Sequence, residues 1–99
     1  MHESKIPSCA VLLAAYNGER WIEEQLDSIL VQTGVRVKVF VSVDFSTDET
    51  LEICERKGNS DSRITILPYG SRFGSAGLNF YRLICDTEPE EFDMFAFSD

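Results

Sequence analysis

The strongest constraint on the fold is an unbroken apolar run, Cys9 to Ala15, which stops abruptly at Tyr16, Asn17 and Gly18. An apolar run without alternation is typical of a strand that is buried on both faces, as in a parallel sheet with helices on each side. The polar break falls at the carboxyl end of this strand. Open parallel sheets bind ligands in the crevice outside those ends. One segment therefore predicts both the fold and the position of a site.

Helical and strand patterns alternate along the rest of the chain. We expect helices over about residues 21–30, 46–57 and 77–85, and strands over residues 36–43, 63–67 and 93–98. Alternation of this kind implies parallel strands joined by right-handed crossovers. The predicted fold class is therefore α/β, a Rossmann-like three-layer α/β/α arrangement around a mainly parallel sheet of four strands.

Local signals predict how the helices begin and which side they bury. Asn17 is expected to cap the first helix and Ser46 the second, the latter in a capping box with Glu49. The third helix is expected to carry its apolar residues on one side; these are Leu78, Tyr81, Ile84 and Cys85.

Composition and charge exclude several classes of function. The net charge of −8 argues against nucleic acid and anionic membrane surfaces as partners, because both require a basic face. No stretch has the length of a membrane span, and residues 1–8, expected to be a flexible segment, lack the apolar centre of a signal peptide. Cys9, Cys54 and Cys85 are odd in number and lie in apolar patterns, so we expect buried thiols and a reducing, cytoplasmic compartment.

Three strands end in polar residues that a packed core does not need. Tyr16 and Asn17 follow the first strand, Asp44 follows the second, and Asp99 follows the fourth. Each alone is explained as a cap or a solvated turn, but parallel strands would bring all three ends to one edge of the sheet. There Asp44 suits the imide N–H of uracil or thymine, or ribose hydroxyls, and Tyr16 offers a flat surface for a base.

A phosphorylated ligand at this edge would need a positive charge beside the two carboxylates. Asp99 suits a ribose hydroxyl or a divalent metal, and Mg²⁺ or Mn²⁺ prefers carboxylate and phosphate oxygens. The loop at residues 70–77 is rich in glycine and includes Arg72. Its amides, with those at the start of the third helix, are further candidates for contacts with phosphate.

Four stretches carry a joint pattern: AVLLAAYNGERWIEEQLDSILVQ, VSVDFSTDETLEI, SRFGSAGLNFYRLI and FDMFAFSD. Together they resemble the amino-terminal half of the family 2 glycosyltransferases, and most of all the bacterial rhamnosyltransferase-like members. The resemblance implies a GT-A fold with strand order 3-2-1-4. It also implies transfer of a sugar, with inversion, from a nucleoside-diphosphate sugar to an acceptor hydroxyl in polysaccharide or cell-surface glycan synthesis, aided by Mg²⁺ or Mn²⁺.

The resemblance also assigns site residues. It places Ala15, Tyr16 and Asn17 in the turn that contacts the nucleotide, Asp44 on the base, and Asp99 at the first acid of the Asp-x-Asp motif, near ribose and metal. The full set expected to bind the nucleotide is Ala15, Tyr16, Asn17, Glu19, Asp44, Ser46, Arg72, Asn79 and Asp99.

The pattern departs from the family at a few positions. Val43 and Phe45 replace an acid and a glycine around Asp44, and Leu78 stands where a basic residue is common. Because the Asp-x-Asp motif would continue past Asp99, we expect residues 9–99 to be the nucleotide-sugar-binding half of a longer domain. The general base, the part that binds a glycan or lipid-linked acceptor, and any contact with the inner face of the membrane would then lie outside these residues.

Further expectations concern partners and alternatives. The donor is expected to be UDP-linked or dTDP-linked. Strand four would be an open edge, which predicts self-association. The alternative is a non-catalytic Rossmann-like nucleotide-binding module or a receiver-type signalling module, although a receiver needs an acidic pair where Tyr16 and Asn17 stand. A dinucleotide-binding oxidoreductase needs a glycine fingerprint after strand one, and only Gly18 is present.

Overall fold

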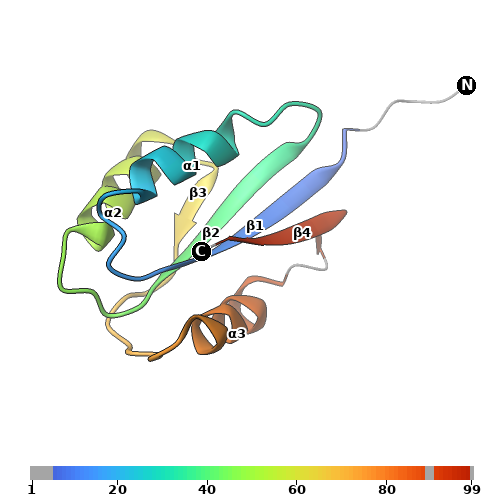
Figure 1. Ribbon diagram of the computed structural model, residues 1–99. Coiled ribbons are helices and arrows are strands. Elements are labelled where there is room, and N and C mark those ends of the chain that lie inside the picture. The colour runs from blue at the N-terminus through green and yellow to red at the C-terminus, as the bar shows by residue number, and fades with distance from the viewer. Residues whose placement is uncertain (1–5, 89–90, 99) are drawn as a thin grey trace, which may run out of the picture.

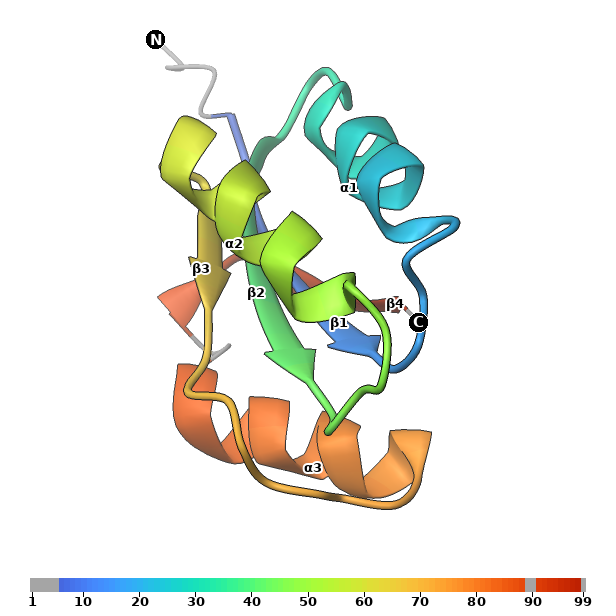
Figure 2. The ribbon, with the colours of Figure 1, turned by 90° about the vertical axis from the view of Figure 1, so that its left-hand side faces the viewer.

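The computed structural model describes residues 6–88 and 91–98 as one layered α/β unit. In chain order its elements are β1 (Ser8–Ala15), α1 (Ile22–Leu30), β2 (Arg36–Val43), α2 (Thr50–Ser60), β3 (Ile64–Ile66), α3 (Ala76–Thr87) and β4 (Met94–Ser98). All strand pairs are parallel, and the sheet order is β3-β2-β1-β4. Helices α1 and α2 cover one face of the sheet and α3 covers the other (Figures 1 and 2). The predicted fold class and strand order are confirmed.

Strand β1 lies between two apolar cores, as its unbroken apolar run predicts. Alternate side chains of β1, including Val11 and Leu13, pack towards α1 and α2 with Leu26 and Cys54. The other set packs with Leu83 of α3; these are Ala10, Leu12 and Ala14. Burial of a leucine side chain contributes about 1.5–3 kcal/mol, so this strand is the main apolar support of the sheet.

Both predicted helix caps were wrong. The amides of Trp21 and Ile22 both bind the carbonyl of Gly18, so α1 begins after a backbone turn and not at Asn17. Asn17 has a φ of 45°, and its side-chain oxygen accepts the amide of Thr47 at 2.9 Å. Ser46 lies before α2, which begins at Thr50. The ends of adjacent parallel strands bring the two turns close together, so these polar side chains bond across the turns and not to their own helices.

The predicted apolar side of α3 was also wrong. Leu78, Tyr81, Ile84 and Cys85 are exposed, whereas the buried positions are Asn79, Leu83 and Thr87. These positions follow the i, i+4, i+8 spacing of one helix face. Two of them are polar, and they can be buried because they are bonded: Thr87 donates to the carbonyl of Leu83 at 2.5 Å and Asn79 donates to β2. Of the other cysteines, Cys54 is buried and Cys9 is half-buried.

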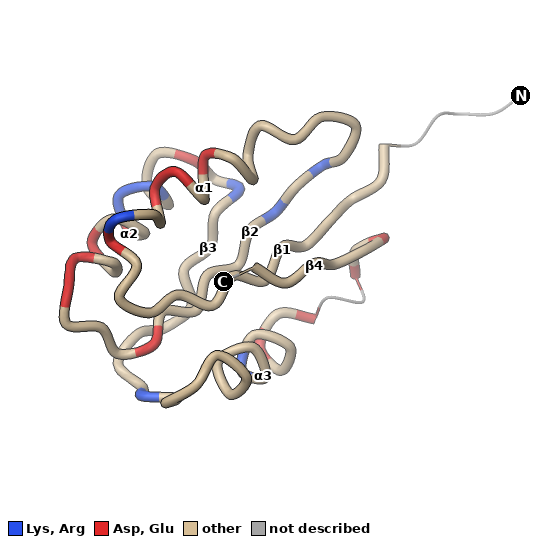
Figure 3. Tube along the Cα trace, viewed as in Figure 1, with Lys and Arg blue, Asp and Glu red and all other residues tan. Residues whose placement is uncertain are grey.

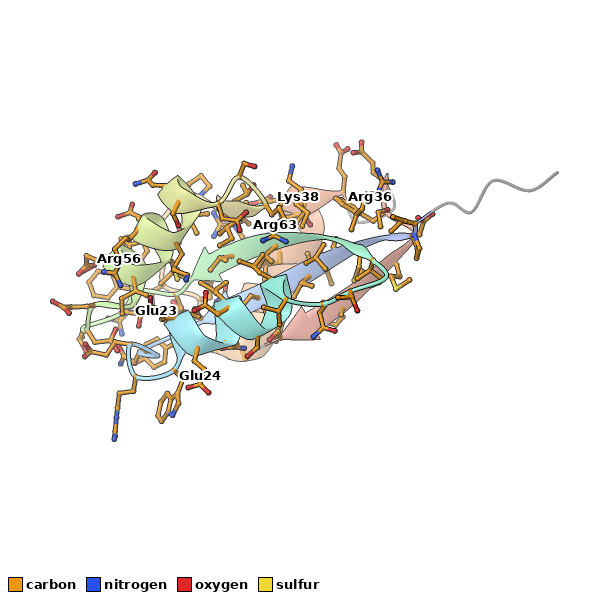
Figure 4. The ribbon with its side chains drawn as sticks, turned by 90° about the horizontal axis from the view of Figure 1, so that it is seen from above. Glu23, Glu24, Arg36, Lys38, Arg56 and Arg63 are labelled. Carbon is orange, nitrogen blue, oxygen red and sulfur yellow. The ribbon has the colours of Figure 1, made fainter. Side chains whose placement is uncertain are left out.

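Charge is distributed unevenly over the molecule. Charged residues are concentrated on α1 and α2, whereas β4 carries none (Figure 3). Where these two helices meet, Arg56 of α2 pairs with Glu23 of α1 at 3.4 Å (Figure 4).

Strand β4 is an open edge of the sheet, and its Phe95 and Phe97 are about half exposed. Self-association through this edge stays a prediction. Within residues 6–88 and 91–98, no helix is long and apolar enough to cross a bilayer.

Candidate functional site

The turn after β1 is bonded tightly to the turn after β2. The amides of Asn17, Gly18 and Glu19 donate to Ser46 Oγ at 3.1 Å, Thr50 Oγ1 at 2.7 Å and Asp48 Oδ2 at 3.2 Å, respectively. Successive free amides in a turn can bind an anion. Here side-chain oxygens already accept hydrogen bonds from these three amides. The turn therefore shapes the cavity, and a phosphate would have to be bound by other groups.

Asp48 is part of this connection and is held ionised by it. Burial raises the pKa of Asp48, but hydrogen bonds from the Thr50 hydroxyl and amide and from the Glu19 amide outweigh burial, so its pKa lies below the ordinary value. A carboxylate that accepts several hydrogen bonds stays charged at neutral pH. The negative charge therefore strengthens the bonds between the two turns.

A cavity of about 540 Å³ opens at the carboxyl ends of β1 and β2, next to the beginning of α3. This is the edge at which the sequence predicts a site. The residues that line it come from both strand ends, from α1 and the turn before it, and from the loop before α3 and the first residue of that helix: Ala14, Ala15, Tyr16, Gly18, Trp21, Ile22, Gln25, Asp44, Phe45, Arg72, Gly74, Ser75 and Ala76.

Asp44 is the buried carboxylate in the wall of the cavity, with 5% of its surface exposed. Its Oδ1 accepts the amides of Phe45 at 2.8 Å and Phe73 at 2.7 Å, and its Oδ2 accepts the amide of Gly74 at 3.0 Å. A carboxylate has about four acceptor positions, so three amides leave one for a ligand. The loop before α3 thus fixes Asp44 and leaves it able to accept one further hydrogen bond.

The mouth of the cavity is aromatic. Tyr16 and Trp21 are more than half exposed, and Phe45 stacks on Tyr69 with a centroid distance of 6.1 Å. The guanidinium of Arg72 lies over the Phe45 ring at 5.3 Å. Exposed aromatic faces beside a cation and a buried acceptor suit a flat, polar ligand that carries negative charge.

The structure brings together four of the predicted site residues: Ala15, Tyr16, Asp44 and Arg72 all line the cavity. The others that it describes lie outside the lining. Asn17 and Ser46 join the two turns, and Glu19 lies on an exposed hollow of α1. Asn79 is buried under the sheet end, where its Nδ2 donates to the carbonyl of Ser42 at 2.9 Å.

Sequence reasoning missed several residues of the lining, among them Trp21, Gln25 and Phe45. Their position in the sequence could have indicated them, because each lies within ten residues after the end of a strand that the sequence predicts clearly. Gln25 also donates to Ser98 Oγ at 2.6 Å, so the described end of β4 meets the wall of the cavity. The predicted residue Asp99 lies outside the described residues.

The described residues do not form a metal site by themselves. Among residues 6–88 and 91–98, no group of three or more histidine, cysteine, aspartate or glutamate side chains is placed to hold an ion. Asp44, the carboxylate of the cavity wall, is already bonded to three amides. The predicted metal ligand, Asp99, is not among the described residues.

Comparisons with known proteins agree with this geometry. The family model for glycosyl transferase family 2 matches residues 10–80. The chain is 54% identical over 88 residues to the dTDP-rhamnosyl transferase RfbG of Shigella flexneri, an alignment that covers 88% of this chain and 30% of that protein.

Two solved structures also match this fold. The crystal structure of S. aureus TarS 1–349 matches with a TM-score of 0.73 and 28% identity, over 93% of this chain and 27% of that one. The mannosyltransferase PcManGT from Pyrobaculum calidifontis, in complex with GDP-Man and Mn²⁺, matches with a TM-score of 0.63 and 29% identity, over 76% and 23% of the two chains. The chain thus spans less than a third of the length of each of these proteins.

Proposed function

The chain belongs to glycosyl transferase family 2, and from this premise we propose that its cavity binds the nucleoside-diphosphate part of a sugar nucleotide. The observation that supports the proposal most directly is the position of Asp44, a buried acceptor in a cavity at the ends of two parallel strands. Ligand sites of open parallel sheets lie at such ends.

The proposal gives each cavity residue a chemical role. Asp44 accepts the imide N–H of the base or a ribose hydroxyl, since it is acceptor-only when ionised. Tyr16 lies against the base, and the main chain of Ala15 forms the floor below it. Arg72, with the amides at the start of α3, meets the diphosphate. Asn17, Glu19, Ser46 and Asn79 act from behind the lining, by holding the turns and β2 in place.

The reaction that we propose is transfer of the sugar from the nucleotide to an acceptor hydroxyl with inversion, in the synthesis of a surface glycan. RfbG is named a dTDP-rhamnosyl transferase, which makes a dTDP-linked or UDP-linked donor the first choice here. Because the chain spans 30% of the length of RfbG, we propose nucleotide binding for residues 9–99 and the complete reaction for a protein of the relative's length.

Dependence on Mg²⁺ or Mn²⁺ is a separate part of the proposal. It is supported by the PcManGT complex with GDP-Man and Mn²⁺ and by Asp99, and not by the described residues, which do not form a site for an ion. A divalent ion would neutralise the diphosphate leaving group. Binding should then be tighter with the metal than without it.

The chain carries its own reporter for this test, since its single tryptophan, Trp21, lines the cavity. Titration with dTDP, UDP and GDP, each with and without Mn²⁺, should give a saturable change of Trp21 fluorescence with dTDP or UDP, and calorimetry should give the same affinity. Arg56→Ala is the control, because Arg56 lies in an exposed ion pair on α2. If neither method detects binding of any of the three nucleotides, with or without metal, the proposal is refuted.

A further inference from the structure

Arg82 joins three separate segments of the fold. It lies on α3, and only 14% of its side chain is exposed. Its Nη1 donates to Ser42 Oγ of β2 at 2.9 Å, its Nη2 donates to the carbonyl of Pro68 at 2.7 Å, and its Nε donates to Asp86 of its own helix at 2.8 Å. Each of its three nitrogens therefore has a partner, and each partner lies in a different segment.

The same guanidinium also contacts the far part of the loop before α3. It lies under the ring of Phe73, with 5.4 Å between the guanidinium carbon and the ring centroid. Pro68 and Phe73 lie near the two ends of this loop, residues 68–74, so Arg82 fixes the loop at both ends. A cation placed over an aromatic ring is attracted to it, so this contact also holds the loop against α3.

These contacts lead directly to Asp44. Phe73, which packs on Arg82, donates its amide to Asp44 Oδ1, and Gly74 donates to Oδ2. Ser42, the partner of Arg82 on β2, lies two residues before Asp44 and also donates to the side-chain oxygen of Asn79. Arg82 therefore acts on both groups that orient the carboxylate, the strand that carries it and the loop that binds it.

We propose that Arg82 is a positioning residue for the nucleotide site. It holds loop 68–74 against β2, so that the amides of Phe73 and Gly74 aim Asp44 into the cavity and Arg72 stays at the cavity mouth. The nucleotide part of this inference rests on the proposed function. Arg82 is absent from the cavity lining, so it acts through Phe73 and Ser42 without touching the ligand.

Lysine is a poor substitute for arginine at this position. The planar guanidinium reaches three partners at fixed angles and lies 5.4 Å from the centre of the Phe73 ring, whereas an ammonium is a compact point charge. Arg82→Lys should keep the charge and the ion pair with Asp86, and should lose the simultaneous bonds to Ser42 and Pro68.

The test compares the variants Arg82→Ala and Arg82→Lys with the control Arg56→Ala, which also removes an arginine from an ion pair. Three properties are measured: the Kd for nucleotide by Trp21 fluorescence, the thermal midpoint, and the amide proton shifts of Phe73 and Gly74 by NMR. We expect both Arg82 variants to weaken nucleotide binding by about ten-fold or more, because loop 68–74 would no longer hold Asp44 and Arg72 in place. A factor of ten corresponds to about 1.4 kcal/mol. The Phe73 and Gly74 amide protons should move upfield as their bonds to Asp44 lengthen, while the Gly18 amide stays in place.

Each outcome decides the question. Unchanged amide shifts of Phe73 and Gly74 in the Arg82 variants overturn the proposal, as does an affinity within two-fold of the wild type at a temperature where the variant is folded. If Arg82→Ala does not fold, Arg82→Lys provides the same test. If the wild-type chain binds no nucleotide, the proposed function fails, and the amide shifts still show whether Arg82 orients Asp44.

Discussion

Replacement of Asp44 by asparagine tests the central feature of the site, a buried carboxylate bound by three amides. The substitution keeps the shape of the side chain and removes its charge and one acceptor. The new carboxamide oxygen can keep the bonds to Phe45 and Phe73, which share one carboxylate oxygen at present. Its NH₂ group then faces the amide of Gly74, where the present distance is 3.0 Å, and two donors oppose each other.

The expected loss of stability follows from these contacts. A hydrogen bond to a charged group contributes about 1.5–3 kcal/mol and a neutral one about 0.5–1.5, while a buried donor left without a partner costs about 1–3 kcal/mol. Each of the two weakened bonds loses about 1–1.5 kcal/mol and the unsatisfied amide costs about 1–3 kcal/mol, which gives a total of about 3–6 kcal/mol. For a domain of this size, each kcal/mol lowers the thermal midpoint by about 4–8 °C, so such a loss lowers it by about 12 °C or more.

The assay is chemical denaturation of both proteins, followed by circular dichroism, with Asp27→Asn as the matched control. Asp27 is a half-exposed carboxylate of α1 that pairs with Lys57, so its replacement should cost less than about 1 kcal/mol. An Asp44→Asn variant within 1 kcal/mol of the wild type would show that the three amides do not depend on this carboxylate. The account of the site would then be wrong.

Three further outcomes are expected. Gly74→Ala should destabilise the protein by about 1–2 kcal/mol, measured by thermal unfolding, because Gly74 has a φ of +83°, which a residue with a Cβ rarely adopts. An added Cβ would meet nothing within 4 Å, so this cost would come from the backbone alone, and an unchanged midpoint would contradict it. Native alkylation followed by peptide mapping should modify exposed Cys85 and spare Cys54, because burial raises the pKa of Cys54 to about 12; equal labelling would count against the fold. The hydrogen bonds of Arg63 lower the pKa of Asp61 from 3.8 to about 2. The stability that this carboxylate contributes is thus present above pH 4 and lost towards pH 2, and Asp61→Asn should flatten that part of the curve of unfolding free energy against pH.

The strands and the position of the site could be predicted because their signals are local. An apolar run without alternation requires a strand with two covered faces, and the polar residues after β1 and β2 mark where that strand environment ends. Tyr16 and Asp44 were found in this way, and both line the cavity. The polar residues that bond across turns could not be assigned in this way. The sequence marks Ser46 as a helix cap, yet its hydroxyl binds the amide of Asn17, which is distant along the chain.

By itself, the sequence of this protein determined an α/β sheet with the order of its elements, and the edge of that sheet, at Tyr16 and Asp44, where the cavity lies. Those properties depend on residues that are neighbours in the chain, so hydrophobic periodicity is enough to show them. Only the tertiary structure decided that α3 exposes Leu78 and Tyr81, and that Arg82 connects β2 to the loop that binds Asp44. The physical reason is that the partners of a buried polar group are set by the packing of distant segments, which no spacing along the chain records.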